Sequence, residues 1–142
     1  MKVLSFFAVC SLFFACNQTK NIETQVQTVP IKATLGSVTT ESEPLTIKTA
    51  SLDGNILSVE IEYSGGCEKH WVDLVGSFSV MKSLPAKRTI KLIHGSNNDH
   101  CRELITESIM FDVSLFAFNQ ESGSEIILLL DGYKEEISYV YP

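Results

Sequence analysis

The sequence predicts an all-β fold: a small antiparallel β-sandwich of about seven to eight strands with one short helical turn, preceded by a signal peptide and a flexible tether. Three observations support this. Apolar and polar residues alternate in short segments such as 57–63, as in strands with one buried face. Asp-Gly pairs at 53–54 and 131–132 are typical of hairpin turns. Only residues 99–105 look helical, over one or two turns.

The expected strands follow one another along residues 45–142. Segment 45–51 pairs with 57–63 through the first Asp-Gly turn. Residues 70–81 form one bent strand, or two short strands broken at Gly76. The more apolar, inward face of this segment carries His70, Val72, Leu74, Phe78 and Val80, and the following strands place Ile90, Leu92, His94, Ile109, Phe111 and Val113 inward.

The last two strands follow the same logic. Residues 126–130 are a continuous apolar run, which predicts a central strand covered on both faces. After the second Asp-Gly turn, Ile137, Tyr139 and Tyr141 alternate in a final strand. Before the domain, residues 16–44 are rich in Thr, Gln, Ser and Asn and predict a tether, with a short strand possible at 31–35.

The N-terminus predicts export. Residues 1–15 contain one basic residue and a short apolar run that ends at Ala15, followed by Cys16. This stretch resembles the lipobox of bacterial lipoproteins in the relaxed form found in Bacteroidetes, because Phe13 stands where leucine is usual. The resemblance implies that Cys16 is lipid-modified and anchors the protein to a membrane. No acidic cluster follows Cys16, which favours an outer-membrane lipoprotein that faces the periplasm.

Composition excludes some partners. The chain has 142 residues, a net charge of −6 and 44% hydrophobic residues, so it is globular with no general attraction to nucleic acid. A protein or small-molecule partner is left unspecified. The local basic run of Lys82, Lys87, Arg88 and Lys91 is interpreted as a solvated loop and strand edge.

Two polar segments carry the candidate site. Cys67 and His70 follow the glycine pair 65–66, and the segment from His94 to Cys101 leaves a later strand. Cys67 and Cys101 are the only cysteines left after the signal peptide is removed and Cys16 is acylated. In an oxidising compartment two such cysteines usually pair, so a disulfide is the favoured interpretation.

Other chemistry stays open for these residues. Cys67, His70, His94 or His100, and Cys101 would suit a tetrahedral zinc or copper site, and a free reactive thiol is a further possibility. Cys67, His70 and Asp99 form a thiol triad on paper, which predicts a hydrolase. No conventional catalytic signature is present, so we expect no catalytic residues and no cofactor. Trp71 is expected to pack over one end of the sandwich rather than to stack on a sugar.

The motifs S-G-G-C-x-x-H, M-K-S-L-P, L-I-H-x-x-N-x-D-x-C and F-D-V-S resemble uncharacterised bacterial envelope lipoproteins. Over about residues 45–141 the layout is similar to the C-terminal β-sandwich of NigD-like proteins from Bacteroidetes, whose usual N-terminal domain we expect to be absent here. The resemblance implies fold and location only. It marks Gly65, Gly66, His70, His94 and Asp99 as motif positions of unknown role.

Taken together, the sequence predicts a lipid-anchored envelope protein whose β-sandwich binds or scaffolds a partner without catalysis. The alternative is a metal-binding envelope lipoprotein that uses the Cys/His cluster. A thiol-dependent envelope hydrolase is the least favoured hypothesis.

Overall fold

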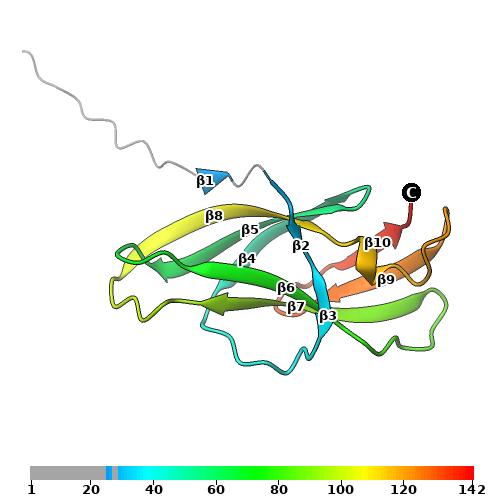
Figure 1. Ribbon diagram of the computed structural model, residues 1–142, viewed down its shortest axis with the longest axis horizontal. Helices are drawn as coiled ribbons and strands as arrows, with labels where there is room; N and C mark the ends of the chain where they lie inside the picture. Colours follow the sequence, from blue (N-terminus) through cyan, green and yellow to red (C-terminus); the bar gives the residue numbers. More distant parts are fainter. Residues whose placement is uncertain (1–24, 27–28) are drawn as a thin grey trace, which may run out of the picture.

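The computed structural model describes residues 25–26 and 29–142, and it has two sheets of five strands each around one core. Figure 1 shows the two layers. No helix in the described part of the chain has the length and apolarity to cross a bilayer. The predicted signal peptide and the lipidated Cys16 lie outside the described residues and stay predictions.

The first sheet has the order β1-β8-β5-β4, with β2 also paired to β8. Strands β4 (Thr46–Asp53) and β5 (Ile56–Gly65) form the predicted hairpin. Gly54 in its turn has φ +54°, a left-handed conformation that favours glycine. Strand β8 (Glu103–Asp112) pairs antiparallel with the whole length of β5.

The second sheet has the order β10-β9-β7-β6-β3. Strands β6 (Trp71–Ser77) and β7 (Ala86–Gly95) pair antiparallel, as do β9 (Glu125–Leu130) and β10 (Glu136–Val140). However, β9 lies parallel to β7. The sheets are therefore mixed, and the expectation of a purely antiparallel sandwich is corrected: the chain leaves β8 in one sheet and enters the other beside β7.

The N-terminal strands are short. β1 (Gln25–Val26) and β2 (Ile31–Lys32) lie parallel to β8, whereas β3 (Thr34–Gly36) lies parallel to β6 in the other sheet. Between β2 and β3, Ala33 is only 1% exposed. The possible strand at 31–35 is thus present as two pieces. The folded part begins before residue 45, where the sequence predicted the end of the tether, because backbone pairing and not composition orders this segment.

The alternating residues form the core. Leu57, Val59 and Ile61 on β5 are completely buried, and they face Ile90 and Leu128 from the second sheet. Each such side chain contributes about 1.5–3 kcal/mol by its burial. Seven of the described strands, β4 to β10, have five residues or more, in agreement with the predicted number.

Two predictions about burial are wrong. β9 is central in its sheet, but only its even-numbered residues are buried, whereas Ile127 and Leu129 are partly exposed. No further layer covers this outer face in the described structure. Phe78, expected on the inward face, is 73% exposed because β6 ends at Ser77 and alternation does not continue past it.

The predicted helical turn at 99–105 is also wrong. Glu103 begins β8 and pairs with Gly65, while Asn97 and Asn98 adopt left-handed φ values of 51° and 59° in a tight turn. The helical turn of the described chain is η1 (Ser114–Phe116) instead.

Arg88 departs from the solvated basic run that the sequence predicted. Its side chain is 5% exposed, Nε donates to the Phe116 carbonyl oxygen at 3.1 Å, and Nη1 donates to the Ser77 carbonyl oxygen. Burial lowers the pKa of this guanidinium. Arg88 therefore joins β7 to the end of β6 and to η1, a structural role that charge patterning does not reveal.

Candidate functional site

One end of the sandwich is closed by a disulfide bond between Cys67 and Cys101. The β5–β6 loop (66–70) and the β7–β8 loop (96–102) meet there, at the left of Figure 1, and we call this region the disulfide end. Gly65 pairs with Glu103 at the end of the β5–β8 ladder. Cys67 lies two residues after Gly65, and Cys101 lies two residues before Glu103. The register of the ladder therefore brings the two sulfur atoms together. The predicted disulfide is confirmed.

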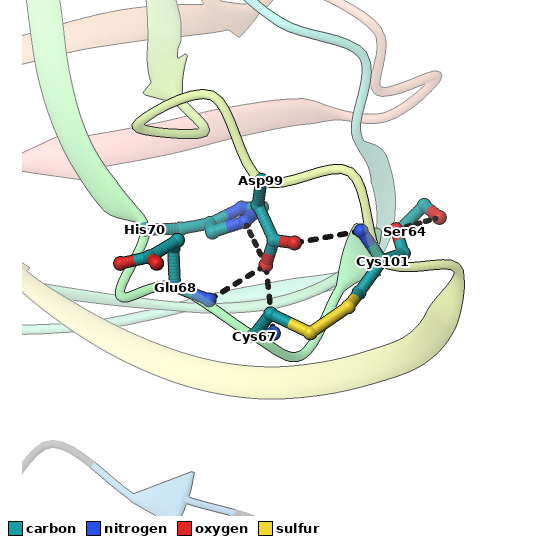
Figure 2. The surroundings of a disulfide bond; sticks show 6 residues. All are labelled: Ser64, Cys67, Glu68, His70, Asp99 and Cys101. Carbon is teal, nitrogen blue, oxygen red and sulfur yellow. Dashed lines mark hydrogen bonds and ion pairs between the residues drawn. A yellow bond between two sulfur atoms is a disulfide. The ribbon is translucent and has the colours of Figure 1, made fainter.

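Asp99 organises the backbone around this bond, as Figure 2 shows. Its Oδ2 accepts the N–H groups of Cys67 and Glu68, both at 2.9 Å, and its Oδ1 accepts the Cys101 N–H at 2.8 Å. The surrounding loops cover the side chain completely, leaving 0% exposed. The pKa of Asp99 is far below its usual value, chiefly because of the Glu68 N–H and then that of Cys101. Asp99 is thus a carboxylate that fixes both loops.

His70 and His94 point into the sandwich behind the disulfide, as the alternation predicted. His70 is 9% and His94 2% exposed. His70 Nε2 lies 3.2 Å from Asp99 Oδ2, and His70 Nδ1 lies 2.8 Å from His94 Nε2. Burial is the main cause that lowers the pKa of His94. The two rings and the Asp99 carboxylate therefore form one continuous buried polar chain.

Tyr63 completes this cluster and was not identified as a site residue from the sequence. Its ring stacks on His70 with centroids 4.6 Å apart, and its hydroxyl donates to Glu107 Oε2 at 3.0 Å. Burial, followed by the charge of Glu107, raises the pKa of Tyr63 to about 12. The alternation of β5 carried the signal, because Tyr63 has the same inward parity as Leu57 and Ile61.

The motif glycines make room for these rings. A Cβ at Gly65 would lie 2.7 Å from the His70 ring, and Gly66 has φ +114°. Trp71 packs on Gly95, its cross-strand neighbour, but stays 47% exposed on the outer face of the second sheet, where the sequence predicted a cover over one end of the sandwich. His100 is exposed on the loop and takes no part in the buried chain.

The segment between β3 and β4, residues 37–45, passes from one sheet to the other and is called the crossing segment. β9 pairs with β7 only as far as Ile90, so the rest of that edge of β7 lacks a strand. The crossing segment lies there instead: the Glu43 N–H donates to the His94 carbonyl at 2.9 Å, and the His94 N–H donates to Ser42 Oγ at 2.9 Å. His94 Nδ1 also lies 3.4 Å from the Glu43 carbonyl oxygen.

A shallow cleft of about 520 Å³ lies between the crossing segment and the ends of β5 and β8. Its lining mixes charged, aromatic and apolar side chains, including those of Glu43, Tyr63, His100, Arg102 and Leu104. The Cys67–Cys101 bond and the buried polar chain lie directly beneath this surface.

The chemistry available at the disulfide end differs from two alternatives that the sequence left open, the zinc or copper site and the reactive thiol. Ligand atoms of Cys67, Asp99 and Cys101 lie within 4.8 Å of one another, without the histidines of the proposed Cys/His set. Both sulfur atoms are in the disulfide, so thiolate ligands or a thiol nucleophile exist only after reduction. A zinc or copper site therefore stays a prediction for the reduced protein. Across residues 29–142, no Ser, Thr or Cys side chain is hydrogen-bonded to a histidine ring.

No family model and no curated protein matches the sequence at a significant level. Among solved structures, a NigD-like immunity protein from Bacteroides caccae matches with a TM-score of 0.60 and 16% identity, over 79% of this chain and 64% of that one. A protein of unknown function, DUF1344, from Bacteroides vulgatus matches with a TM-score of 0.54 and 18% identity, over 80% and 58%. The chain thus spans less than two thirds of either neighbour. At these identities the likeness concerns the fold, and the chain has a NigD-like β-sandwich fold.

Proposed function

We propose that this protein is a lipid-anchored cell-envelope protein whose β-sandwich binds or scaffolds a partner and catalyses no reaction. The observation that carries the proposal is the disulfide end. Three segments distant in sequence meet there, and the Cys67–Cys101 bond and the Asp99 carboxylate hold two of them in place. Preorganised loops at one end of a sandwich lose little conformational entropy on binding.

The disulfide also supports the envelope location. Disulfides persist in oxidising compartments and are rare in the bacterial cytoplasm, so the Cys67–Cys101 bond fits an exported chain. The lipobox-like sequence that ends at Cys16 accounts for export and anchoring together. Neither structural neighbour is described as an enzyme. We place the protein on the periplasmic side of the outer membrane.

Anchoring is tested by expressing the full chain in a bacterial host fed a clickable fatty acid. The wild-type chain should carry the label and fractionate with membranes, whereas Cys16→Ser should lose both properties. Cys10→Ser, within the apolar run of the signal peptide, is the matched control and should keep them. An unlabelled, soluble wild-type chain contradicts the proposal.

Binding is tested with a photoreactive amino acid placed at one of two exposed loop positions in the native host. Asn98 lies in the β7–β8 loop at the disulfide end, and Lys82 lies in the β6–β7 loop at the opposite end of the same strand pair. A partner that cross-links from Asn98 and not from Lys82 supports a recognition surface at the disulfide end. Equal cross-linking from both positions, or from Lys82 alone, contradicts it.

A further inference from the structure

The buried polar chain behind the disulfide has hydrogen-bond acceptors at both ends. At one end the Asp99 carboxylate faces His70 Nε2 at 3.2 Å. At the other end the carbonyl oxygen of Glu43 faces His94 Nδ1 at 3.4 Å. In the middle, His70 Nδ1 and His94 Nε2 lie 2.8 Å apart. Three contacts therefore involve all four ring nitrogens of the pair.

The number of hydrogens that the three contacts require fixes the charge of the buried polar chain. Asp99 already accepts three backbone N–H groups, so it acts as an acceptor only, and a carbonyl oxygen is always an acceptor. His70 Nε2 and His94 Nδ1 must therefore both carry hydrogens, and the central contact needs a third. Two neutral imidazoles carry only two, so the complete chain holds one additional proton.

We infer that the His70–His94 pair is a binding site for one proton, and that this proton holds the crossing segment against the disulfide end. The proton lies on His70, beside the Asp99 carboxylate, and His94 is neutral with its hydrogen on Nδ1. The lowered pKa of His94, which burial causes, agrees with this assignment. The inference adds a pH-dependent contact and does not depend on the proposed binding function.

The groups around the pair are compatible with a single positive charge. From β5, Tyr63 stacks on His70 and gives its hydroxyl hydrogen to Glu107 of β8. The crossing segment contributes Glu43, whose charge also favours protonation of His94, and the β7–β8 loop contributes Asp99. Burial and the nearby His70 oppose a second proton, on His94. The cluster thus favours one proton over two.

Loss of the additional proton would change the contact between His94 Nδ1 and the Glu43 carbonyl oxygen. His70 would keep its hydrogen on Nε2 for Asp99, so the central hydrogen would have to come from His94 Nε2. His94 Nδ1 would then carry a lone pair facing the Glu43 carbonyl oxygen, and the contact would become repulsive. A second proton would make both rings imidazolium cations, with His70 Nδ1 and His94 Nε2 only 2.8 Å apart. The crossing segment is therefore held best when the His70–His94 pair carries one additional proton, and less well when it carries none or two.

The direct test is a nitrogen-15 NMR measurement of the ring tautomers in the intact, disulfide-bonded protein at pH 7. We expect hydrogens on both ring nitrogens of His70 and only on Nδ1 of His94. The exposed His100, which takes no part in the buried polar chain, serves as the internal reference for the ring signals. If His70 and His94 each carry a single hydrogen at pH 7, on whichever nitrogen, the pair holds no additional proton and the inference is overturned.

A second measurement follows the crossing segment itself. The Glu43 amide, which donates to the His94 carbonyl, should lose at least about tenfold of its exchange protection once His70 is deprotonated. The Lys87 amide donates to the Met81 carbonyl in the β6–β7 region and should keep its protection. Constant Glu43 protection across that pH range would refute the link to the crossing segment.

Asp99→Asn removes the counter-charge and should lower the pH at which His70 loses its proton by about one unit or more, a tenfold loss of proton affinity. His100→Gln is the matched control and should leave that pH unchanged. An unchanged His70 titration in folded Asp99→Asn contradicts the assignment of the proton to His70. If Asp99→Asn does not fold, the wild-type tautomers and Glu43 exchange decide the question.

Discussion

Trp71 and Gly95 face each other across β6 and β7, and the indole ring occupies the space that a side chain at position 95 would need. The aromatic ring covers backbone that glycine leaves bare, and the absence of a Cβ allows the ring to lie close to the strand. Trp71 begins β6 and Gly95 ends β7, so the pair lies on the outer face of the second sheet beside the loops of the disulfide end.

Gly95→Ala should displace this ring. Trp71 is the single tryptophan of the chain, so its fluorescence reports the change directly. We expect a red shift of the emission maximum and a loss of about 1–3 kcal/mol in the free energy of unfolding, the usual cost of overpacking. Gly36→Ala is the control, since its Cβ would meet Val75 at 3.1 Å, far from the indole, and should leave the emission unchanged. An unshifted spectrum in Gly95→Ala would contradict the packing.

Removal of either cysteine should have the same effect on stability. The bond joins positions 34 residues apart, and in the chain-entropy model its loss costs about 3–4 kcal/mol. Cys67→Ala, Cys101→Ala and the double variant should unfold at similar urea concentrations, and reduction of the wild-type protein should reproduce them. Clearly different stabilities of the two single variants would indicate a role for one cysteine beyond the bond.

Arg88→Met should destabilise the protein far more than the neighbouring Lys87→Met. Arg88 is buried and donates to the Phe116 and Ser77 carbonyls, so its loss leaves both acceptors without a charged donor and costs about 2–4 kcal/mol. Lys87 forms a surface ion pair with Glu136, which is worth at most about 1 kcal/mol. Chemical denaturation of both variants makes the comparison, and equal losses would speak against the buried role of Arg88.

The protein should lose stability at high pH through two tyrosines. Burial, as the main cause, raises the pKa of Tyr63 and of Tyr139 from 10 to about 12. Since the folded state holds these protons more tightly than the unfolded state, their contribution is complete below pH 10 and is lost as the pH rises from 10 through 12. Tyr63→Phe should flatten this dependence in urea unfolding curves. The same slope in wild type and Tyr63→Phe would show that Tyr63 does not contribute.

The sequence predicted the parts of the fold that depend on local pattern. Alternation placed Leu57, His70 and His94 inward, and the Asp-Gly turn at 53–54 predicted the first hairpin, because side-chain parity and turn chemistry are local properties. The parallel pairing of β7 with β9 and the two-sheet path of residues 31–36 depend on contacts between distant segments, which a single sequence does not encode in any local pattern.

The site was predicted in the same uneven way. The two cysteines that remain after export and acylation predicted the Cys67–Cys101 bond. The family-like motif included Asp99 but gave it no role. The role of Asp99 depends on three backbone N–H groups converging on one carboxylate, and a backbone donor has no sequence signature. For the same reason the burial of Arg88 by two carbonyl groups could not be read from a basic run.

The division of residues 31–36 between the two sheets has a mechanical consequence. Ile31 and Lys32 are bonded to β8, and four residues later Gly36 is bonded to β6 on the opposite layer. A pull on the N-terminal side of the domain is therefore transmitted to both layers within one short stretch of chain. Tension from that side would load the two sheets together instead of peeling one away from the other, which suits a domain held by its N-terminal end.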